Sequence, residues 1–439
     1  MLIKNNKYLI TTILSIYTIL FLHFEPPWGL MDDYRFIYLI PELFKDFLFV
    51  SFEIVTTRAF DRGMLQPFFV LEKFIQYLPG YLTKPYISYI FNLFIIFLCH
   101  LYFYKGVSRF IKIRYSSSIL IFFIWPFTND LLFLISLEEK LIFLLGGLLI
   151  YKIKENSNNL IIFFSTFFLP LIKLQGSIFL FIFIAIYLIE KKKIWLVGIY
   201  GLVCGVLLQA YFIFFNQGDY FVYNSSFEKL FNNFLAREHI LIFFIILFLF
   251  FVINKKEKNE QIFIFGLVVS LFSLIFIYSN WNLYGYLFAT YSFFLSMILP
   301  IFEISILSKF NKAYLKEITS ILLLISLVFS MFVFFLPRAE RWSDLNSTIE
   351  QLSQDTSKKI IYYCGTEGTR WLSELNLIHE FKFIPNPSDI SEKDFFLIKD
   401  DYNCNYFTDT LVEYCYLTKF PSYQNYERFY LLYANCIKS

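Results

Sequence analysis

The chain has 439 residues, of which 58% are hydrophobic, 22% aromatic and only 17% charged. An ordinary soluble domain has about 25% charged residues, so this composition excludes a water-soluble fold for the chain as a whole. The formal net charge of +3 is small, and the placement of the charges carries more information than their sum. We expect the lipid bilayer to surround most of the protein, and we expect no nucleic acid among its partners.

Apolar runs long enough to cross a hydrocarbon core recur along the chain, and basic loops separate them on alternate turns. Lys and Arg are retained on the cytoplasmic side of short loops, so these loops predict a cytoplasmic N-terminus and an extracytoplasmic C-terminus. The pattern predicts about eleven spans. The expected spans cover residues 8–24, 86–104, 116–127, 141–151, two short helices within 160–189, 194–215, 240–253, 262–278, 287–307 and 318–335.

The run 160–189 is too long for one unkinked span of about 20 residues. It also carries Lys173, Gln175 and Gly176 in its middle. A single helix here would place the lysines at 191–193 outside, against the charge rule. We therefore expect two short helices joined by an outer turn.

The composition divides the chain into an all-α polytopic membrane bundle over residues 1–336 and a polar part over 337–439. The first external loop is expected over residues 25–84. Its middle, 36–54, mixes apolar and charged residues, which is typical of a helix lying on the membrane surface. The polar part has the size of a small domain, and we expect it to be an extracytoplasmic α/β unit.

Alternating patterns in the polar part predict its elements. Strands are expected at 359–364, 395–399 and 429–436, and helices at 370–379 and 408–416. An external compartment is oxidising, so at least one disulfide is expected among the cysteines of this part. They are Cys364, Cys404, Cys415 and Cys436, and their three possible pairings remain open.

Two adjacent acids, Asp32 and Asp33, follow the first expected span almost at once. Like charges this close raise the pKa of one carboxyl, and such a pair can take a proton from a hydroxyl or hold a divalent ion. Whether the pair binds a divalent cation such as Mg or Mn as a cofactor is therefore left open. A histidine-based zinc site is not expected, because the four histidines are scattered without ligand spacing. A solvated loop that holds an acid pair by chance is the alternative.

This layout resembles the GT-C superfamily of polytopic glycosyltransferases, which have an acidic motif directly after the first span and a surface helix behind it. Asp32-Asp33 occupies that place. The segment 58–67 is similar to a Gly-Arg-x-x-Pro stretch of bacterial members, although Arg62 precedes Gly63 and Gln66 stands where an Arg is common. In size and layout the chain looks most like the serotype-modifying branch that adds glucose to O-antigen.

The resemblance implies an inverting transfer from a polyprenyl-phosphate sugar, such as an undecaprenyl-phosphate sugar, to an acceptor hydroxyl. Asp32 or Asp33 would serve as the base, and Arg58, Arg62 and Lys173 would bind the donor phosphate. For each cation the alternative is contact with lipid head groups. Substrate contacts are expected from Gln66, Asp130, Glu138, Gln175, Trp281 and Tyr284, although Trp and Tyr also gather at bilayer interfaces without a ligand.

We therefore expect a glycosyltransferase of the bacterial cytoplasmic (inner) membrane that acts outside on a cell-surface glycan or lipid-glycan acceptor. Two alternatives remain. An O-antigen polymerase would have a large central external loop, and the loop 216–238 is short. A non-enzymatic flippase or transporter of lipid-linked sugars has no evident use for a soluble C-terminal domain.

Overall fold

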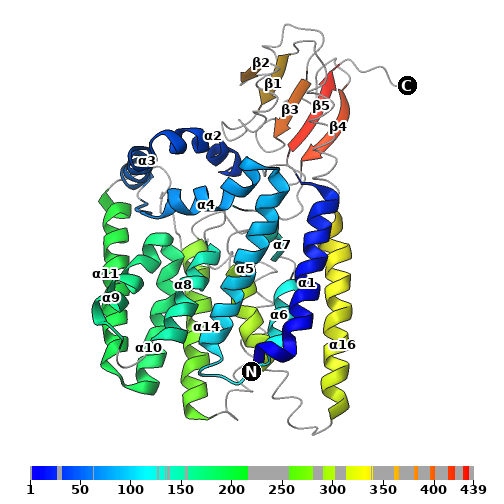
Figure 1. The fold of residues 1–439 in the computed structure, drawn as a ribbon. Coiled ribbons are helices and arrows are strands. Elements are labelled where there is room, and N and C mark those ends of the chain that lie inside the picture. The colour runs from blue at the N-terminus through cyan, green and yellow to red at the C-terminus, as the bar shows by residue number, and fades with distance from the viewer. Residues whose placement is uncertain are drawn as a thin grey trace.

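The computed structural model shows a bundle of helices with a β-sheet at one end (Figure 1). It describes residues 2–26, 32–62, 64–125, 128–133, 135, 139–153, 157–215, 257–279, 290–301, 313–337 and 339, and five strands between 360 and 434. For the strands and for some helix ends, including 32–38 and 61–62, the description covers the backbone alone.

Four of the described helices contain segments long and apolar enough to cross a membrane. They are α1 (Leu2–Phe24), α5 (Pro85–Val107), α11 (Lys193–Phe215) and α16 (Ala313–Ser330), the last continued by the π-helical turn η3 (Met331–Phe335). Large apolar side chains such as Ile325 and Phe329 point outward from α16. Such exposure suits a helix that faces lipid, so the chain is a multi-pass membrane protein.

Further apolar helices complete the described bundle, in the places that the sequence predicts. They are α6 (Tyr115–Ile124), α8 (Glu139–Lys152), α9 (Asn159–Ile172), α10 (Phe179–Glu190), α14 (Lys258–Ser279) and the helix Thr290–Ile301. The expected span at 240–253 lies outside the described residues.

The predicted division of the run 160–189 is confirmed. The helix α9 ends at Ile172, the 3-10 turn η1 (Leu174–Ile178) follows, and α10 begins at Phe179. Gly176 lies in this turn, and a Cβ atom there would come within 2.1 Å of the Leu169 carbonyl oxygen. Because only glycine fits so close to a neighbouring backbone, the break is encoded locally.

Small residues allow α9 and α11 to pack closely. Cβ atoms at Gly201 and Gly205 would come within 2.3 Å of the carbonyl oxygens of Phe163 and Phe167, respectively. The two glycines are four residues apart, so they lie on one face of α11, as in the small-xxx-small motif of membrane helices. Close backbone approach thus replaces the hydrophobic driving force, which is weak between helices in lipid.

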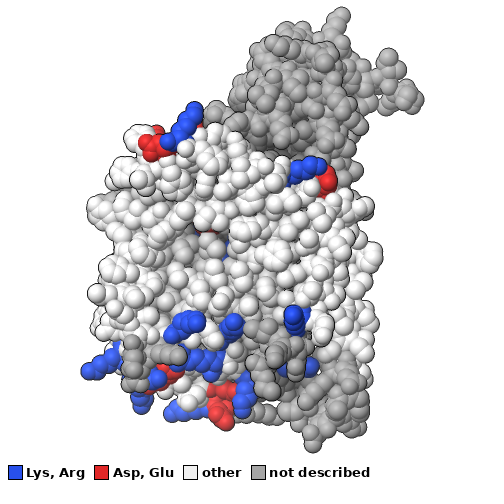
Figure 2. Space-filling view, viewed as in Figure 1, with Lys and Arg blue, Asp and Glu red and all other residues white. Residues whose placement is uncertain are grey.

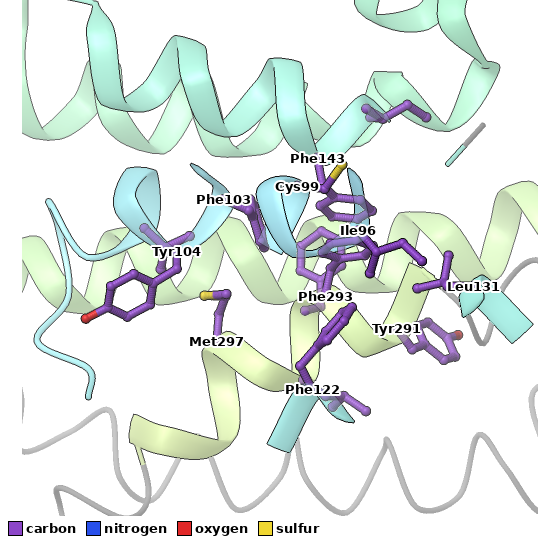
Figure 3. Packing of buried hydrophobic residues seen from close by; sticks show 14 of the residues in the cluster. Ile96, Cys99, Phe103, Tyr104, Phe122, Leu131, Phe143, Tyr291, Phe293 and Met297 are labelled. Atoms are coloured by element: carbon purple, nitrogen blue, oxygen red, sulfur yellow. The ribbon is translucent and has the colours of Figure 1, made fainter. Parts of the chain in front are cut away.

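Aromatic rings fill the centre of the bundle (Figure 3). Phe143 of α8 stacks on Phe293 with ring centroids 4.2 Å apart, and Phe103 of α5 meets Phe143 edge-on at 5.0 Å. A second group ties α16 to α1, because Phe335 packs edge-on against Tyr17 and Phe21. The rings are buried in a core that joins helices distant in sequence.

Three helices, α2 (Asp32–Lys45), α3 (Phe47–Arg62) and α4 (Phe69–Leu82), cross one end of the bundle (Figure 1). The single surface helix predicted over 36–54 is therefore two helices. They separate at Asp46, whose carboxylate accepts a hydrogen bond from the Phe49 backbone N–H at 3.0 Å and caps α3. The sequence did not predict α4.

The C-terminal part contains a five-stranded sheet in the order β2-β1-β3-β5-β4. Its strands are β1 (Ile360–Cys364), β2 (Glu380–Phe383), β3 (Phe396–Asp400), β4 (Tyr414–Phe420) and β5 (Phe429–Ala434). The first three are mutually parallel where they pair, and β5 is antiparallel to both β3 and β4. The predicted strands at β1, β3 and β5 are confirmed, and β2 is additional.

One predicted element of this part is wrong. The helix expected over 408–416 overlaps β4, in which Tyr414, Cys415 and Tyr416 pair with β5. Aromatic and β-branched residues favour strands, and pairing with a neighbour outweighs the short helical pattern. The helix expected over 370–379 lies outside the described residues.

Candidate active site

The described Lys and Arg residues are concentrated at one end of the bundle (Figure 2). Arg109 holds this end together, since its Nη2 lies 2.6 Å from the Glu190 carboxylate. Its Nη1 donates hydrogen bonds of 3.0 Å to the carbonyl oxygens of both Ile150 and Ile153. The layer of α2, α3 and α4 lies at the opposite end, together with the sheet (Figure 1).

Asp32 and Asp33 are the first residues of α2, so their backbone lies in this layer. Their side chains are outside the described residues, as are those of several other predicted site residues. Those are Arg62 at the end of α3, Asp130 in α7 (Thr128–Phe133), Glu138, Trp281 and Tyr284.

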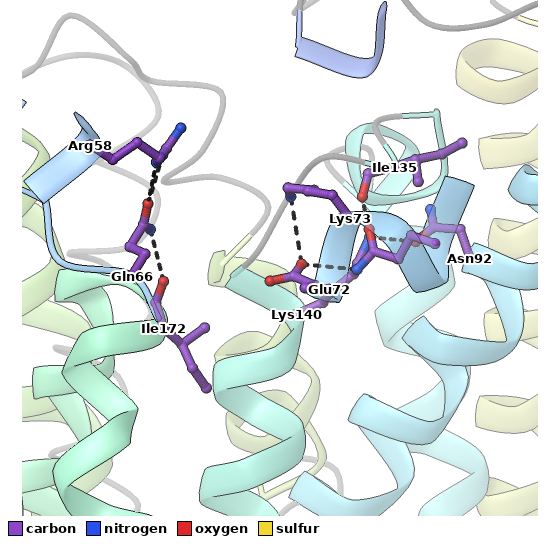
Figure 4. Close-up of polar contacts among 9 residues, drawn as sticks. Arg58, Gln66, Glu72, Lys73, Asn92, Ile135, Lys140 and Ile172 are labelled. Carbon is purple, nitrogen blue, oxygen red and sulfur yellow. Dashed lines mark hydrogen bonds and ion pairs between the residues drawn. The ribbon is translucent and has the colours of Figure 1, made fainter. Parts of the chain in front are cut away.

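The structure brings Arg58 and Gln66 together (Figure 4). The Nε and Nη2 atoms of Arg58 donate to the Gln66 side-chain oxygen at 3.0 and 2.6 Å, and the guanidinium lies 3.6 Å from the centre of the Phe69 ring. The Gln66 amide nitrogen donates in turn to the Ile172 carbonyl oxygen at 2.8 Å. Gln66 thus bridges the α3–α4 connection to the end of α9.

The residue after Ile172 is Lys173, which leaves α9 in an extended conformation and opens the turn η1. Gln175 in that turn is fully buried, and neither of its amide atoms has a hydrogen-bond partner within the described part of the chain. Buried polar atoms are nearly always paired. The partner of this amide is therefore expected outside the described part of the chain.

A buried charged cluster, not predicted from the sequence, lies beneath α4 (Figure 4). Lys73 is only 2% exposed, and its ammonium nitrogen lies 3.6 Å from the Glu72 carboxylate. Gln76, one turn further along α4, donates a hydrogen bond of 2.9 Å to the same carboxylate oxygen. Ion pairs removed from water are costly, so their presence calls for a structural or functional reason.

Lys140 of α8 adds a second buried ammonium group, with no exposed surface. It donates hydrogen bonds to the Asn92 side chain and, at 2.7 Å, to the Ile135 carbonyl oxygen. Lys140 lies beside Glu72 and Lys73 in Figure 4, so the charges of α4 and α8 form one cluster. The sequence signal for it is the presence of charges inside apolar segments, where they are expensive.

The described side chains include no group of three or more His, Cys, Asp or Glu residues that could hold a metal ion. The acid pair at 32–33 is not among those side chains. A divalent cation at the pair thus stays a prediction, and the described cluster offers cations and amides instead.

No family model matches the chain, and no curated protein matches it in sequence. In three dimensions the chain has the GT-C fold of polytopic membrane proteins. The solved structure of ArnT from Cupriavidus metallidurans in the apo state matches 98% of this chain and 98% of its own, with a TM-score of 0.52 and 9% sequence identity. This likeness shows the fold that the sequence resemblance implied, and it does not extend to the serotype-modifying branch.

Proposed function

We propose that this protein is a glycosyltransferase of the bacterial cytoplasmic membrane that transfers a sugar from a polyprenyl-phosphate donor to a glycan or lipid-glycan acceptor. The observation that carries the proposal is the pair of buried lysines beneath the α2–α4 layer, in a GT-C fold. The structural neighbour ArnT is itself a GT-C glycosyltransferase, which supports the same reaction class.

The donor explains why charge is buried here. A polyprenyl tail keeps the donor in the bilayer, so the phosphate must reach cations at the end of the bundle. Lys73 and Lys140 would attract a phosphate strongly, because little water screens them. Glu72 and Asn92 hold the two ammonium groups in place, and Lys173, Arg58 and Arg62 are the further cations proposed for the donor.

The acceptor hydroxyl needs a base. In the proposed reaction its oxygen attacks the anomeric carbon of the donor sugar while the bond from that carbon to the phosphate oxygen breaks, with inversion. The proton passes to Asp32 or Asp33, and the phosphate leaves on its lipid. The buried Gln175 amide is available to a sugar hydroxyl. The sugar is proposed to be a hexose such as glucose, and the reaction is proposed to occur on the extracytoplasmic side.

The test is sugar transfer by the purified full-length protein in vesicles that contain a polyprenyl-phosphate sugar. Asp32→Asn or Asp33→Asn keeps the side-chain size but cannot take a proton, so transfer is expected to fall by about 10²–10⁴-fold. Glu53→Gln is the matched control, because Glu53 is an exposed acid of α3 in the same layer. Near-normal transfer by both Asp variants would reject these residues as the base.

The same vesicle assay distinguishes the proposed transferase from a flippase and from a polymerase. A flippase would move the lipid-linked sugar across the bilayer without transferring it, and a polymerase would join lipid-linked oligosaccharides rather than add one sugar. Either outcome in the wild-type protein would contradict the proposal.

A further inference from the structure

A cavity of about 320 Å³ opens between α8 and α9 at the basic end of the bundle. Its walls are mainly apolar and include Leu148, Ile161 and Ile162, with Lys152 and Asn158 among the lining residues. The proposed active site lies at the other end of the molecule, so this cavity is a separate feature.

The cavity continues onto a surface suited to lipid. On α9 the side chains of Leu160, Ile161 and Phe164 are 67%, 63% and 51% exposed. Such a row of exposed apolar residues faces hydrocarbon in a membrane bundle. An acyl chain that lies along α9 would therefore remain in apolar surroundings as it enters the cavity.

Lys152 lines the cavity, and a second lysine, Lys105, contacts the same tyrosine ring as Lys152. The ammonium nitrogens of Lys152 and Lys105 lie 5.4 and 5.5 Å from the centre of the same ring, that of Tyr151. Both lysines therefore contact one aromatic ring at the end of α8, which brings two positive charges to the same part of the surface. The carbonyl oxygen of the Asn158 side chain caps α9 by accepting from the Leu160 N–H at 2.9 Å, so it is already engaged.

We propose that this cavity is a binding site for an anionic phospholipid of the surrounding leaflet. The acyl chain would lie along Leu148, Ile161 and Ile162, and the phosphate would sit between Lys105 and Lys152. Basic pockets between membrane helices at the cytoplasmic side suit anionic head groups for this reason. The lipid site is independent of the proposed transferase activity, since it is measured as binding and not as transfer.

The experiment uses the full-length protein in nanodiscs that contain photoreactive phosphatidylglycerol or photoreactive phosphatidylcholine. The cross-linked residues are mapped by mass spectrometry. Phosphatidylglycerol is expected to label residues 148–162 in preference to phosphatidylcholine. Lys152→Gln and Lys105→Gln should each lower that preference by about five-fold, since each lysine near the surface contributes about this factor.

Two further variants distinguish the contribution of the lysine charges to lipid binding from that of the cavity's shape. Lys193→Gln removes an exposed lysine at the same end that does not line the cavity, so it should leave the preference unchanged. Ile161→Trp fills the cavity from an exposed position and should reduce labelling by both lipids.

Three results would overturn the site. The first is equal labelling by the two lipids, and the second is a preference that survives in both Lys152→Gln and Lys105→Gln. The third is competition by inorganic phosphate as effective as that by phosphatidylglycerol, because it would assign the lysines to a free anion and leave the apolar walls without a role.

Discussion

Lys73 and Lys140 place two ammonium groups where almost no solvent reaches them. In a medium of low polarity a charge interacts over longer distances than in water, and an unpaired charge is costly. The neighbouring Glu72, Gln76 and Asn92 offset part of this cost. An incoming phosphate would offset more of it, which links the stability of this cluster to donor binding.

Lys73→Gln should reduce both stability and sugar transfer. The variant removes a cation that lies 3.6 Å from the buried Glu72 carboxylate, which should cost about 3–5 kcal/mol in the free energy of unfolding. Loss of a group that stabilises the leaving phosphate should lower transfer by about 10²–10³-fold. Thermal unfolding in detergent and the vesicle assay measure the two effects.

A double variant separates the two roles of Lys73. Glu72→Gln combined with Lys73→Gln removes both charges, so stability should recover while transfer stays low. Lys84→Gln is the control, because Lys84 is an exposed lysine that pairs with Glu25. If transfer recovers along with stability in the double variant, Lys73 has a structural role and does not act on the donor.

At the scale of elements, α9 and α11 pack closely at Gly201 but leave more space at Gly198, another glycine of α11. A Cβ atom at Gly201 would lie 2.3 Å from both the Phe163 carbonyl oxygen and the Thr166 hydroxyl oxygen. At Gly198, one turn earlier on α11, the nearest atom is a Thr166 methyl carbon at 3.5 Å, an ordinary contact.

Gly201→Ala is therefore expected to destabilise the protein by about 1–3 kcal/mol, because backbone must move to admit the methyl group. Gly198→Ala makes the same chemical change on the same helix and should leave stability nearly unchanged. Thermal unfolding of the two variants in detergent is the measurement. Equal effects would show that the close approach of α9 and α11 does not limit stability.

The sheet order narrows the disulfides expected in the C-terminal part. Cys364 ends β1 and Cys415 lies in β4, with β3 and β5 between them. Adjacent strands are about 4.8 Å apart, so three such steps separate these Cα atoms by about 14 Å. A disulfide requires less than about 7 Å, which excludes the Cys364–Cys415 pair.

Cys364 and Cys415 should therefore each pair with Cys404 or Cys436, if they pair at all. Mass spectrometry of the unreduced, digested protein would identify the linked peptides. Recovery of a Cys364–Cys415 peptide would contradict the strand order, and six free thiols would contradict the expected oxidising location.

At the scale of the whole molecule, the N-terminal end of α1 and the sheet lie at opposite ends of the bundle (Figure 1). Most of the described Lys and Arg residues visible in Figure 2 lie at the end at which α1 begins. The charge rule assigns that end to the cytoplasm, which would place the α2–α4 layer and the sheet outside.

A periplasmic reporter such as alkaline phosphatase fused after Ser439 is expected to be active. A fusion in the loop at 191–193 should be inactive with the same reporter and active with a cytoplasmic one. The reverse pattern would place Asp32 and Asp33 in the cytoplasm and remove them from the proposed reaction side.

The sequence by itself determined the membrane class, the approximate places of most described bundle helices and the break between α9 and α10. These features depend on hydrophobicity and charge summed over neighbouring residues, and on one glycine at 176 that no larger residue can replace. Three of the five strands were predicted for the same reason, whereas β4 was missed because pairing with β5 outweighed its local pattern.

Only the tertiary structure showed which polar groups meet. Gln66 reaches the Ile172 carbonyl oxygen 106 residues away, and Lys73 and Lys140 share a cluster although they come from α4 and α8. A sequence pattern identifies a charge inside an apolar segment as expensive, but its partner depends on how the helices pack. Packing is set by the close contacts of glycines and aromatic rings along many helices at once, and no local window of sequence contains them.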